Sequence, residues 1–93
     1  MTFGDIIKSK RIEKKMGLRE FSKKVELSPS FVCLLENGKT KPPKESNITK
    51  IAEVLDIDKD LLLAKANKVP IDILNILISN YRHYYNLIRK SNK

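Results

Sequence analysis

Apolar side chains recur at close to helical spacing between residues 3 and 16, and this periodicity predicts a first helix, with Thr2 suited to cap its N-terminus. Gly17 interrupts the pattern, which resumes over residues 18–25 and predicts a second helix. In that helix, Glu20 is placed to complete a capping box. The first quarter of the chain is therefore expected to form two short helices.

A third helix is predicted after Ser28, which suits an N-cap and precedes Pro29 at the first turn, where a missing backbone N–H is tolerated. Gly38 follows the last periodic residue and ends this helix. Only residues 26 and 27 separate the second and third helices, so the connection is a tight turn. Two short helices joined in this way are typical of the helix-turn-helix motif.

The second half of the chain contains three further helical patterns. A fourth helix is predicted from about Asn47, after a loop in which two adjacent prolines forbid regular structure, and a fifth over residues 59–66, capped by Asp58. From Pro70 onwards, apolar residues recur at intervals of three and four, which is typical of a heptad seam along one helix. The seam consists of Ile71, Leu74, Ile78, Tyr81, Tyr85 and Ile88.

These patterns predict an all-α chain of six helices, because no segment shows the alternation that is typical of a strand. Residues 1–69 are expected to form a five-helix domain that contains the helix-turn-helix motif, and residues 70–93 a C-terminal amphipathic helix. At 93 residues, a single core is adequate but thin, so burial against a partner would add stability.

Charge narrows the choice of partner. The chain has a formal net charge of +8, from 19 Lys and Arg against 11 Asp and Glu, and residues 1–45 contain eleven of the basic and six of the acidic side chains. Such an excess favours polyanions, either nucleic acid or a membrane surface. A membrane surface is the weaker alternative, because the lysines fall on a globular motif and not along one amphipathic helix. We expect nucleic acid, and no membrane partner.

The chain offers little catalytic or metal-binding chemistry. Cys33 is its one cysteine, which excludes an internal disulfide, and His83 its one histidine, which leaves no metal-ligand cluster of recognised spacing. Neither a nucleophile beside a base nor a glycine-rich phosphate loop occurs, so we expect neither enzyme activity nor a cofactor. No signal peptide or spanning helix is predicted, and we expect the protein to be cytoplasmic.

The sequence resembles the lambdoid phage repressor and Cro group, within the wider family of XRE-type regulators. The resemblance is carried by KSKRI at residues 8–12, SPSFV at residues 28–32 and LLENGKTKPP at residues 34–43, and it covers about residues 3–66. It implies a five-helix Cro/phage-repressor-like domain whose third helix enters the DNA major groove while the second crosses the backbone, usually as a dimer on a near-palindromic operator.

The resemblance also implies roles for individual residues. Arg11 and Glu36 match a pair that, in the phage repressors, forms an ion pair between the first helix and the end of the third, and their expected role is architectural. The residues expected to face base edges are Pro29, Ser30, Cys33 and Leu34. The residues expected to lie near phosphates are Arg19, Ser28, Phe31, Lys39, Thr40, Lys41 and Lys44.

The predicted third helix departs from the family pattern, because none of its base-facing positions holds Gln, Arg, Asn or Lys, whose paired hydrogen-bonding groups discriminate bases. Ser30 offers one ambiguous hydrogen bond, while Leu34, Phe31 and the ring of Pro29 are suited to contact thymine methyl groups, a weaker form of recognition. DNA shape, a basic arm or half-site spacing are alternative sources of specificity.

We interpret the chain as a sequence-specific double-stranded DNA-binding transcriptional regulator, expected to repress from a near-palindromic operator as a homodimer. Two alternatives stay open: an antitoxin-like or other protein-binding module whose C-terminal helix docks a partner protein, and the controller protein of a restriction–modification system. The C-terminal helix could also pack within its own protomer. The residues expected to dimerise are Leu74, Ile78, Tyr81, Tyr85 and Ile88.

Overall fold

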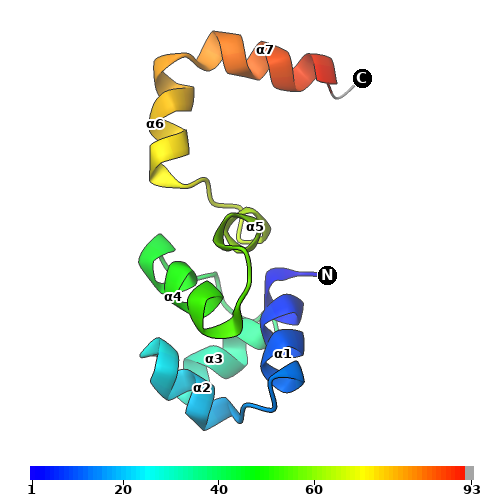
Figure 1. Cartoon of the computed structure of the whole chain (residues 1–93), viewed down its shortest axis with the longest axis vertical. Coiled ribbons are helices and arrows are strands. Elements are labelled where there is room, and N and C mark those ends of the chain that lie inside the picture. The colour runs from blue at the N-terminus through cyan, green and yellow to red at the C-terminus, as the bar shows by residue number, and fades with distance from the viewer. Residues whose placement is uncertain (92–93) are drawn as a thin grey trace.

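The structure, a computed structural model, describes residues 1–91, which form seven α-helices and no strand (Figure 1). The molecule is elongated, with principal extents of 45 × 25 × 23 Å. No helix among these residues is both long enough and apolar enough to cross a membrane. The helices are α1 (Phe3–Glu13), α2 (Leu18–Val25), α3 (Pro29–Glu36), α4 (Glu45–Leu55), α5 (Lys59–Lys65), α6 (Ile71–Ser79) and α7 (Tyr81–Ser91).

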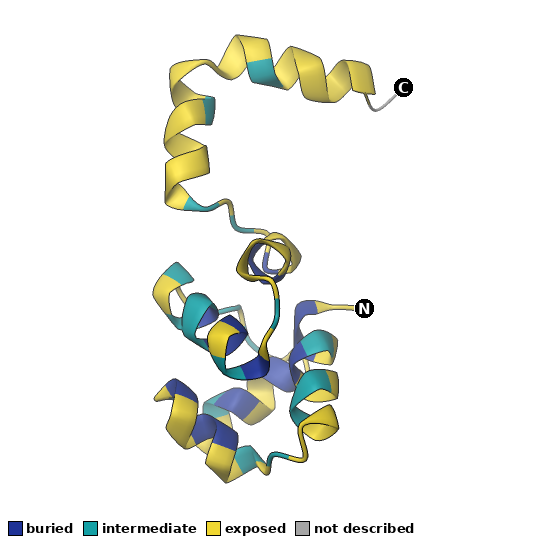
Figure 2. Ribbon diagram, in the orientation of Figure 1, coloured by how far each residue is buried: buried dark blue, intermediate teal, exposed yellow. Residues whose placement is uncertain are grey.

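Helices α1–α5 enclose one buried core, while α6 and α7 project from it as an arm (Figures 1 and 2). The core is made of the periodic apolar residues of the first five helices, together with Ala66 directly after α5. Within the described part of the arm, neither helix contains a buried residue. The core that holds the domain together therefore receives nothing from the last two helices.

Side-chain caps fix the starts of three helices where the sequence indicates them. The hydroxyl of Thr2 accepts the Asp5 N–H at 3.2 Å, and the Asp5 carboxylate accepts the Thr2 N–H at 3.0 Å, a bond that lowers the pKa of Asp5 from its ordinary value. Ser28 accepts the Phe31 N–H at 3.1 Å at the start of α3, and Asp58 caps α5 in a similar way. These bonds satisfy backbone donors that a helix N-terminus leaves without partners.

Two other helix starts differ from the prediction. Helix α2 begins after Gly17, which has no side chain to cap it, and the capping box expected from Glu20 does not form. Helix α4 begins at Glu45 and not at about Asn47, because Lys44 already adopts the extended N-cap conformation directly after the two prolines. The backbone of the residue that follows the prolines thus decides where α4 starts.

The prediction of one C-terminal helix, and with it the total of six helices, is wrong. The backbone leaves the helical region at Asn80, with φ −130° and ψ 39°, so the segment divides into α6 and α7 (Figure 1). The Asn80 N–H closes α6 on Ile76, while its carbonyl accepts the N–H groups of His83 and Tyr84 and starts α7. Asparagine favours helix ends over helix interiors because its side chain competes for backbone hydrogen bonds. The heptad spacing therefore continues in sequence across a break in structure.

Helix α1 approaches the end of α3 at Gly4, which is buried. A Cβ atom added at Gly4 would clash with the backbone carbonyl oxygens of Leu35 and Glu36, the second at a distance of 2.8 Å. Backbone atoms cannot move aside as the end of a flexible side chain can. The absence of a side chain at Gly4 therefore sets how closely α1 packs on α3.

We expect Gly4→Ala to lower the free energy of unfolding by about 1–3 kcal/mol, because the added methyl group overpacks the contact between α1 and α3. Gly17→Ala is the matched control, because a Cβ there meets nothing within 4 Å. Its effect should stay below about 1 kcal/mol. Urea and thermal unfolding followed by circular dichroism measure both, and equal stability of the two variants would contradict the close approach.

Candidate nucleic-acid interface

The turn between α2 and α3 is built around Glu26, which adopts the left-handed conformation with φ 59° and ψ 37°. The N–H of Leu27 bonds back to the Ser22 carbonyl at 3.0 Å, which closes the C-terminus of α2. Lys50 of α4 reaches the Glu26 carboxylate at 3.1 Å. The turn therefore redirects the chain within two residues, and α3 begins at the Ser28 cap.

Helix α3 is held from beneath by the core. Val32 and Leu35 of α3 are buried, as are Phe21 and Val25 of α2, so the two helices share one apolar contact. The hydroxyl of Ser22 is buried too and donates to the Leu18 carbonyl at 2.7 Å. The remaining face of α3 is left exposed on a rigid support.

A bidentate ion pair joins α1 to the end of α3. The Arg11 Nε donates to Glu36 Oε2 at 2.7 Å and Nη2 to Oε1 at 3.0 Å, while Nη1 donates to the Met16 carbonyl at 2.9 Å. The Glu36 side chain is only 5% exposed and that of Arg11 only 13%. The hydrogen bond to Glu36 raises the pKa of Arg11 above its ordinary value, against the opposing effect of burial. The pair links two helices inside the domain, and its burial favours an architectural role over contact with nucleic acid.

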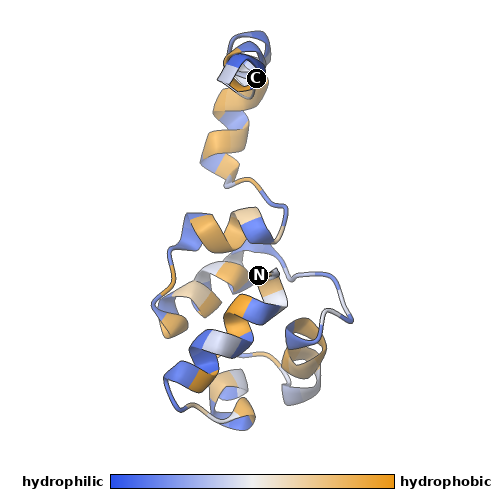
Figure 3. Cartoon of the chain, turned by 90° about the vertical axis from the view of Figure 1, so that its right-hand side faces the viewer, coloured by the Kyte–Doolittle hydropathy of each residue, from blue (hydrophilic) through white to orange (hydrophobic). Residues whose placement is uncertain are grey.

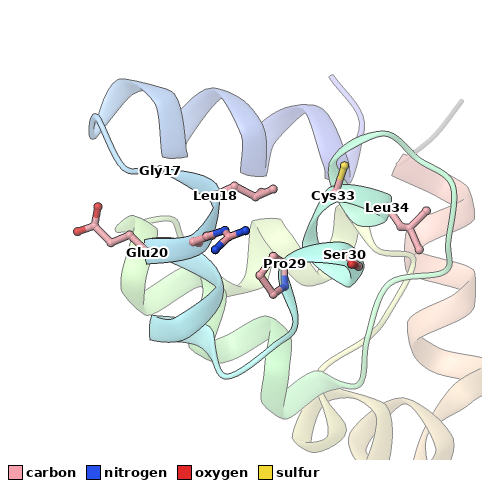
Figure 4. Close-up of a pocket in the computed structure, with 8 residues that line it drawn as sticks. Gly17, Leu18, Glu20, Pro29, Ser30, Cys33 and Leu34 are labelled. Atoms are coloured by element: carbon pink, nitrogen blue, oxygen red, sulfur yellow. The ribbon is translucent and has the colours of Figure 1, made fainter.

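The four residues expected to face bases come together on one surface. Pro29, Ser30, Cys33 and Leu34 are exposed, and together with Gly17 and the first turn of α2, residues 18–20, they line an open groove of about 760 Å³ (Figure 4). The groove lies between the start of α2 and the outer face of α3. It is the surface that a helix-turn-helix motif turns toward its partner.

The groove is more apolar than sequence reasoning alone indicated. Leu18 enters it from α2, half-buried, although only α3 was expected to supply apolar contacts. Glu20 also lies at the groove, with its carboxylate 3.9 Å from the Lys24 ammonium. Sequence alone missed both residues. Both lie in the first turn of α2, at the end of the helix opposite the turn at Glu26, and the sequence carries no signal that α3 packs across that end.

The residues expected to lie near phosphates lie in three places. Arg19 is exposed in the first turn of α2, while Ser28 and Phe31 line a second hollow, of about 590 Å³, together with Lys44. Phe31 is half-buried and packs against the core, and the Ser28 hydroxyl is engaged in its cap. The other residues of this set follow α3 in the loop: Lys39 and Lys41 are exposed and Thr40 is half-buried.

The residues expected to dimerise are all exposed, but the break at Asn80 divides them between two helices. Leu74 and Ile78 lie on α6, whereas Tyr81, Tyr85 and Ile88 lie on α7, where the two tyrosine rings meet edge to face with centroids 6.0 Å apart. Within residues 1–91, no group of three or more His, Cys, Asp or Glu side chains is arranged to hold a metal ion.

Residues 4–68 match the model of the helix-turn-helix domain family, and the chain belongs to that family. The resemblance seen in the sequence is thereby confirmed, as is the all-α fold class. Over 68 residues the chain is 31% identical to the HTH-type transcriptional repressor RghR of Bacillus subtilis (strain 168). The match covers 73% of this chain and 50% of RghR, so the chain spans about half the length of that relative.

Solved structures share the fold. The crystal structure of SinR, the master regulator for biofilm formation, in complex with DNA is similar with a TM-score of 0.61 and 29% identity, over 67% of this chain and 98% of that one. The SinR protein/SinI protein complex gives a TM-score of 0.61 at 24% identity over 97% and 99% of the two chains. The clp gene regulator ClgR from Corynebacterium glutamicum gives 0.60 at 19% identity over 96% and 88%.

Replacing Arg11 tests the ion pair. Arg11→Met should lower the free energy of unfolding by about 3 kcal/mol, because it leaves the Glu36 carboxylate buried without its partner. Adding Glu36→Gln should recover part of this loss, since the buried charge is then removed. Lys10→Met is the control: Lys10 pairs with Glu13 at 3.4 Å on the surface, and its loss should cost less than about 1 kcal/mol. Urea unfolding of the wild type and the three variants measures these changes, and a similar loss in both single variants would contradict an architectural pair.

Proposed function

We propose that the chain is a sequence-specific double-stranded DNA-binding transcriptional regulator that acts as a repressor. The observation that carries the proposal is the exposed face of α3, supported from beneath by the core and flanked by basic residues of α2 and of the loop after α3. An α-helix with its side chains is about 10–12 Å in diameter, which suits the width of the major groove. Pro29, Ser30, Cys33 and Leu34 would face the bases.

The relatives support the same function. RghR is named a transcriptional repressor, and SinR has been solved with DNA bound, at 29% identity to this chain. The proposal of repression, as opposed to activation, rests on the RghR name.

The phosphate contacts are assigned by position and charge. Arg19 lies at the positive end of the α2 dipole, where an anion is favoured, and Lys44 occupies the N-cap position of α4 beside the hollow that Phe31 and Ser28 line. Residues 39–41 extend this basic surface along the loop that follows α3. Such contacts would position the protein on DNA without reading its sequence.

Selection from randomised duplex DNA tests the proposal. The full chain is expected to enrich a near-palindromic consensus, and light scattering should size the recovered complexes as a protein dimer on one duplex. Failure to enrich any sequence above non-specific binding would contradict a sequence-specific regulator.

Charge-reversal variants sharpen this test. Lys39→Glu combined with Lys41→Glu should weaken binding to the selected site at least about tenfold and flatten its salt dependence, because phosphate contacts release counterions. Lys59→Glu combined with Lys65→Glu makes the same change of charge on α5, where both lysines are exposed, and should retain most of the affinity. Equal losses in the two pairs would mean that net charge matters and the loop does not.

In this proposal, residues 1–69 form the DNA-binding domain and residues 70–93 form the dimerisation element. What supports the second assignment is the apolar composition of α6, whose ribbon is mostly orange in Figure 3. Ile73, Ile76 and Ile78 of this helix are each about half exposed or more. Isolated helices of this length are marginal in water, so an arm without a core of its own gains stability from a partner. A two-fold dimer would also place two α3 helices at a spacing of about one DNA turn.

Substitutions in the arm test dimerisation. Ile78→Asp and Tyr81→Asp should each give a monomer that binds the operator poorly, since a charge is placed in an apolar interface. Ser79→Asp is the matched control, because Ser79 lies with Asp72 and Asn75 on the polar stripe of α6. Sedimentation equilibrium measures the outcome. Charged variants that remain dimeric would place the interface elsewhere, and a monomeric wild type would favour a different protein as the partner of the arm, as in the antitoxin-like alternative.

A further inference from the structure

The outer face of α3 carries few hydrogen-bonding groups. Among its eight residues there is no amide and no guanidinium group, and the one carboxylate, that of Glu36, is buried in the ion pair with Arg11. Of the exposed residues, Pro29 and Leu34 have no polar side-chain atom, and the Cys33 sulfur already accepts the side-chain amide of Asn37 at 3.4 Å. The Ser30 hydroxyl is the strongest donor left on this face.

Apolar surface lines the groove from both helices. Leu34 is 44% exposed and lies at one end of the groove. Leu18, the first residue of α2, lines the groove from the other helix (Figure 4). Pro29 and Cys33 lie along α3 between them. The two charged residues at the groove, Arg19 and Glu20, both come from the first turn of α2, so the part formed by α3 is apolar apart from Ser30.

The edges of base pairs in the major groove offer one apolar group, the C5-methyl group of a pyrimidine, present in thymine and in 5-methylcytosine. From this match we infer that the groove recognises C5-methyl groups in the major groove, with Leu34 as the residue that determines specificity and Leu18 as a second apolar wall of the same groove. The inference rests on the proposed function, because it presupposes that α3 enters duplex DNA. In this chain, apolar contact with methyl groups would take the place of the hydrogen bonds by which recognition helices usually distinguish bases.

Deoxyuridine substitution isolates the methyl group, because uracil differs from thymine only at C5. Each thymine of the selected site is replaced singly, and binding of the full chain is measured by fluorescence anisotropy. At one or more positions of each half-site we expect an affinity loss of about three- to fivefold, the effect of one buried methyl group. Replacements in the flanking sequence are the control and should be neutral.

A second selection from duplexes that carry 5-methylcytosine separates the two sources of the methyl group. If thymine is the ligand, the consensus should be unchanged and cytosine methylation outside it should have no effect. If 5-methylcytosine is the ligand, a methylated site should be enriched and its unmethylated form should bind three- to fivefold more weakly. Either result supports recognition of C5-methyl groups.

Leu34→Ala links the effect to a residue. In this variant, replacing thymine by deoxyuridine at one position of the half-site should leave the affinity almost unchanged, because the side chain that contacts the methyl group is gone. Leu61→Ala removes a leucine of similar exposure on α5 and should keep the full penalty. A penalty that is unchanged in Leu34→Ala would overturn the assignment of this residue.

The experiment separates failure of this inference from failure of the proposed function. Enrichment of a specific site in which every deoxyuridine and 5-methylcytosine replacement is neutral would leave a DNA-binding regulator and overturn recognition of methyl groups. Loss of a guanine preference in Arg19→Ala, on that same site, would then assign specificity to α2. No binding to any duplex would overturn both proposals, and the apolar groove would become a candidate surface for a protein.

Discussion

The presentation of α3 depends on how its C-terminal end is fixed against α1. Two features act at the last two residues of α3: Gly4 brings the α1 backbone against the carbonyls of Leu35 and Glu36, and Arg11, about two turns further along α1, pairs with the Glu36 side chain. A buried carboxylate is costly unless its charge and its lone pairs are matched, and the guanidinium of Arg11 matches both oxygens in a planar geometry. Because the same guanidinium also holds the Met16 carbonyl, the path of the chain into α2 is set by the contact that holds α3.

The molecule therefore has two parts that differ in packing: the five-helix domain, which has a buried core, and the arm, which has none. Inside the first five helices, most of the periodic apolar residues are used in the core, and the exposed face of α3 lies outside that packing. The arm has no core of its own, since its two short helices contain no buried residue in the described structure. A DNA-binding surface on a rigid support and an association surface on a separate arm can change independently, because few contacts connect them.

What the sequence predicts well is what local chemistry decides. Thr2, Ser28 and Asp58 mark helix starts because each supplies an oxygen to a backbone donor that otherwise lacks a partner, and the fold class follows from the apolar period between such marks. Glu26 is different: a non-glycine residue in the left-handed region is disfavoured locally, so the turn is stabilised by tertiary packing and by Lys50. The break at Asn80 was missed for the opposite reason, because the heptad spacing is a property of side chains and persists where the backbone hydrogen bonds stop.

The candidate site shows a similar division between what sequence and geometry supply. The family resemblance assigns positions on α3 residue by residue, but it does not say that Leu18 of the preceding helix would share their surface, since this depends on the angle between α2 and α3. Charge is the easier quantity to predict and the less informative one: an excess of eight positive charges favours any polyanion and steers association without selecting a sequence. Few hydrogen-bonding side chains lie on α3, and the lysines expected to contact phosphates lie outside it. The apolar groove between α2 and α3 is therefore the surface from which we propose that discrimination between sites comes.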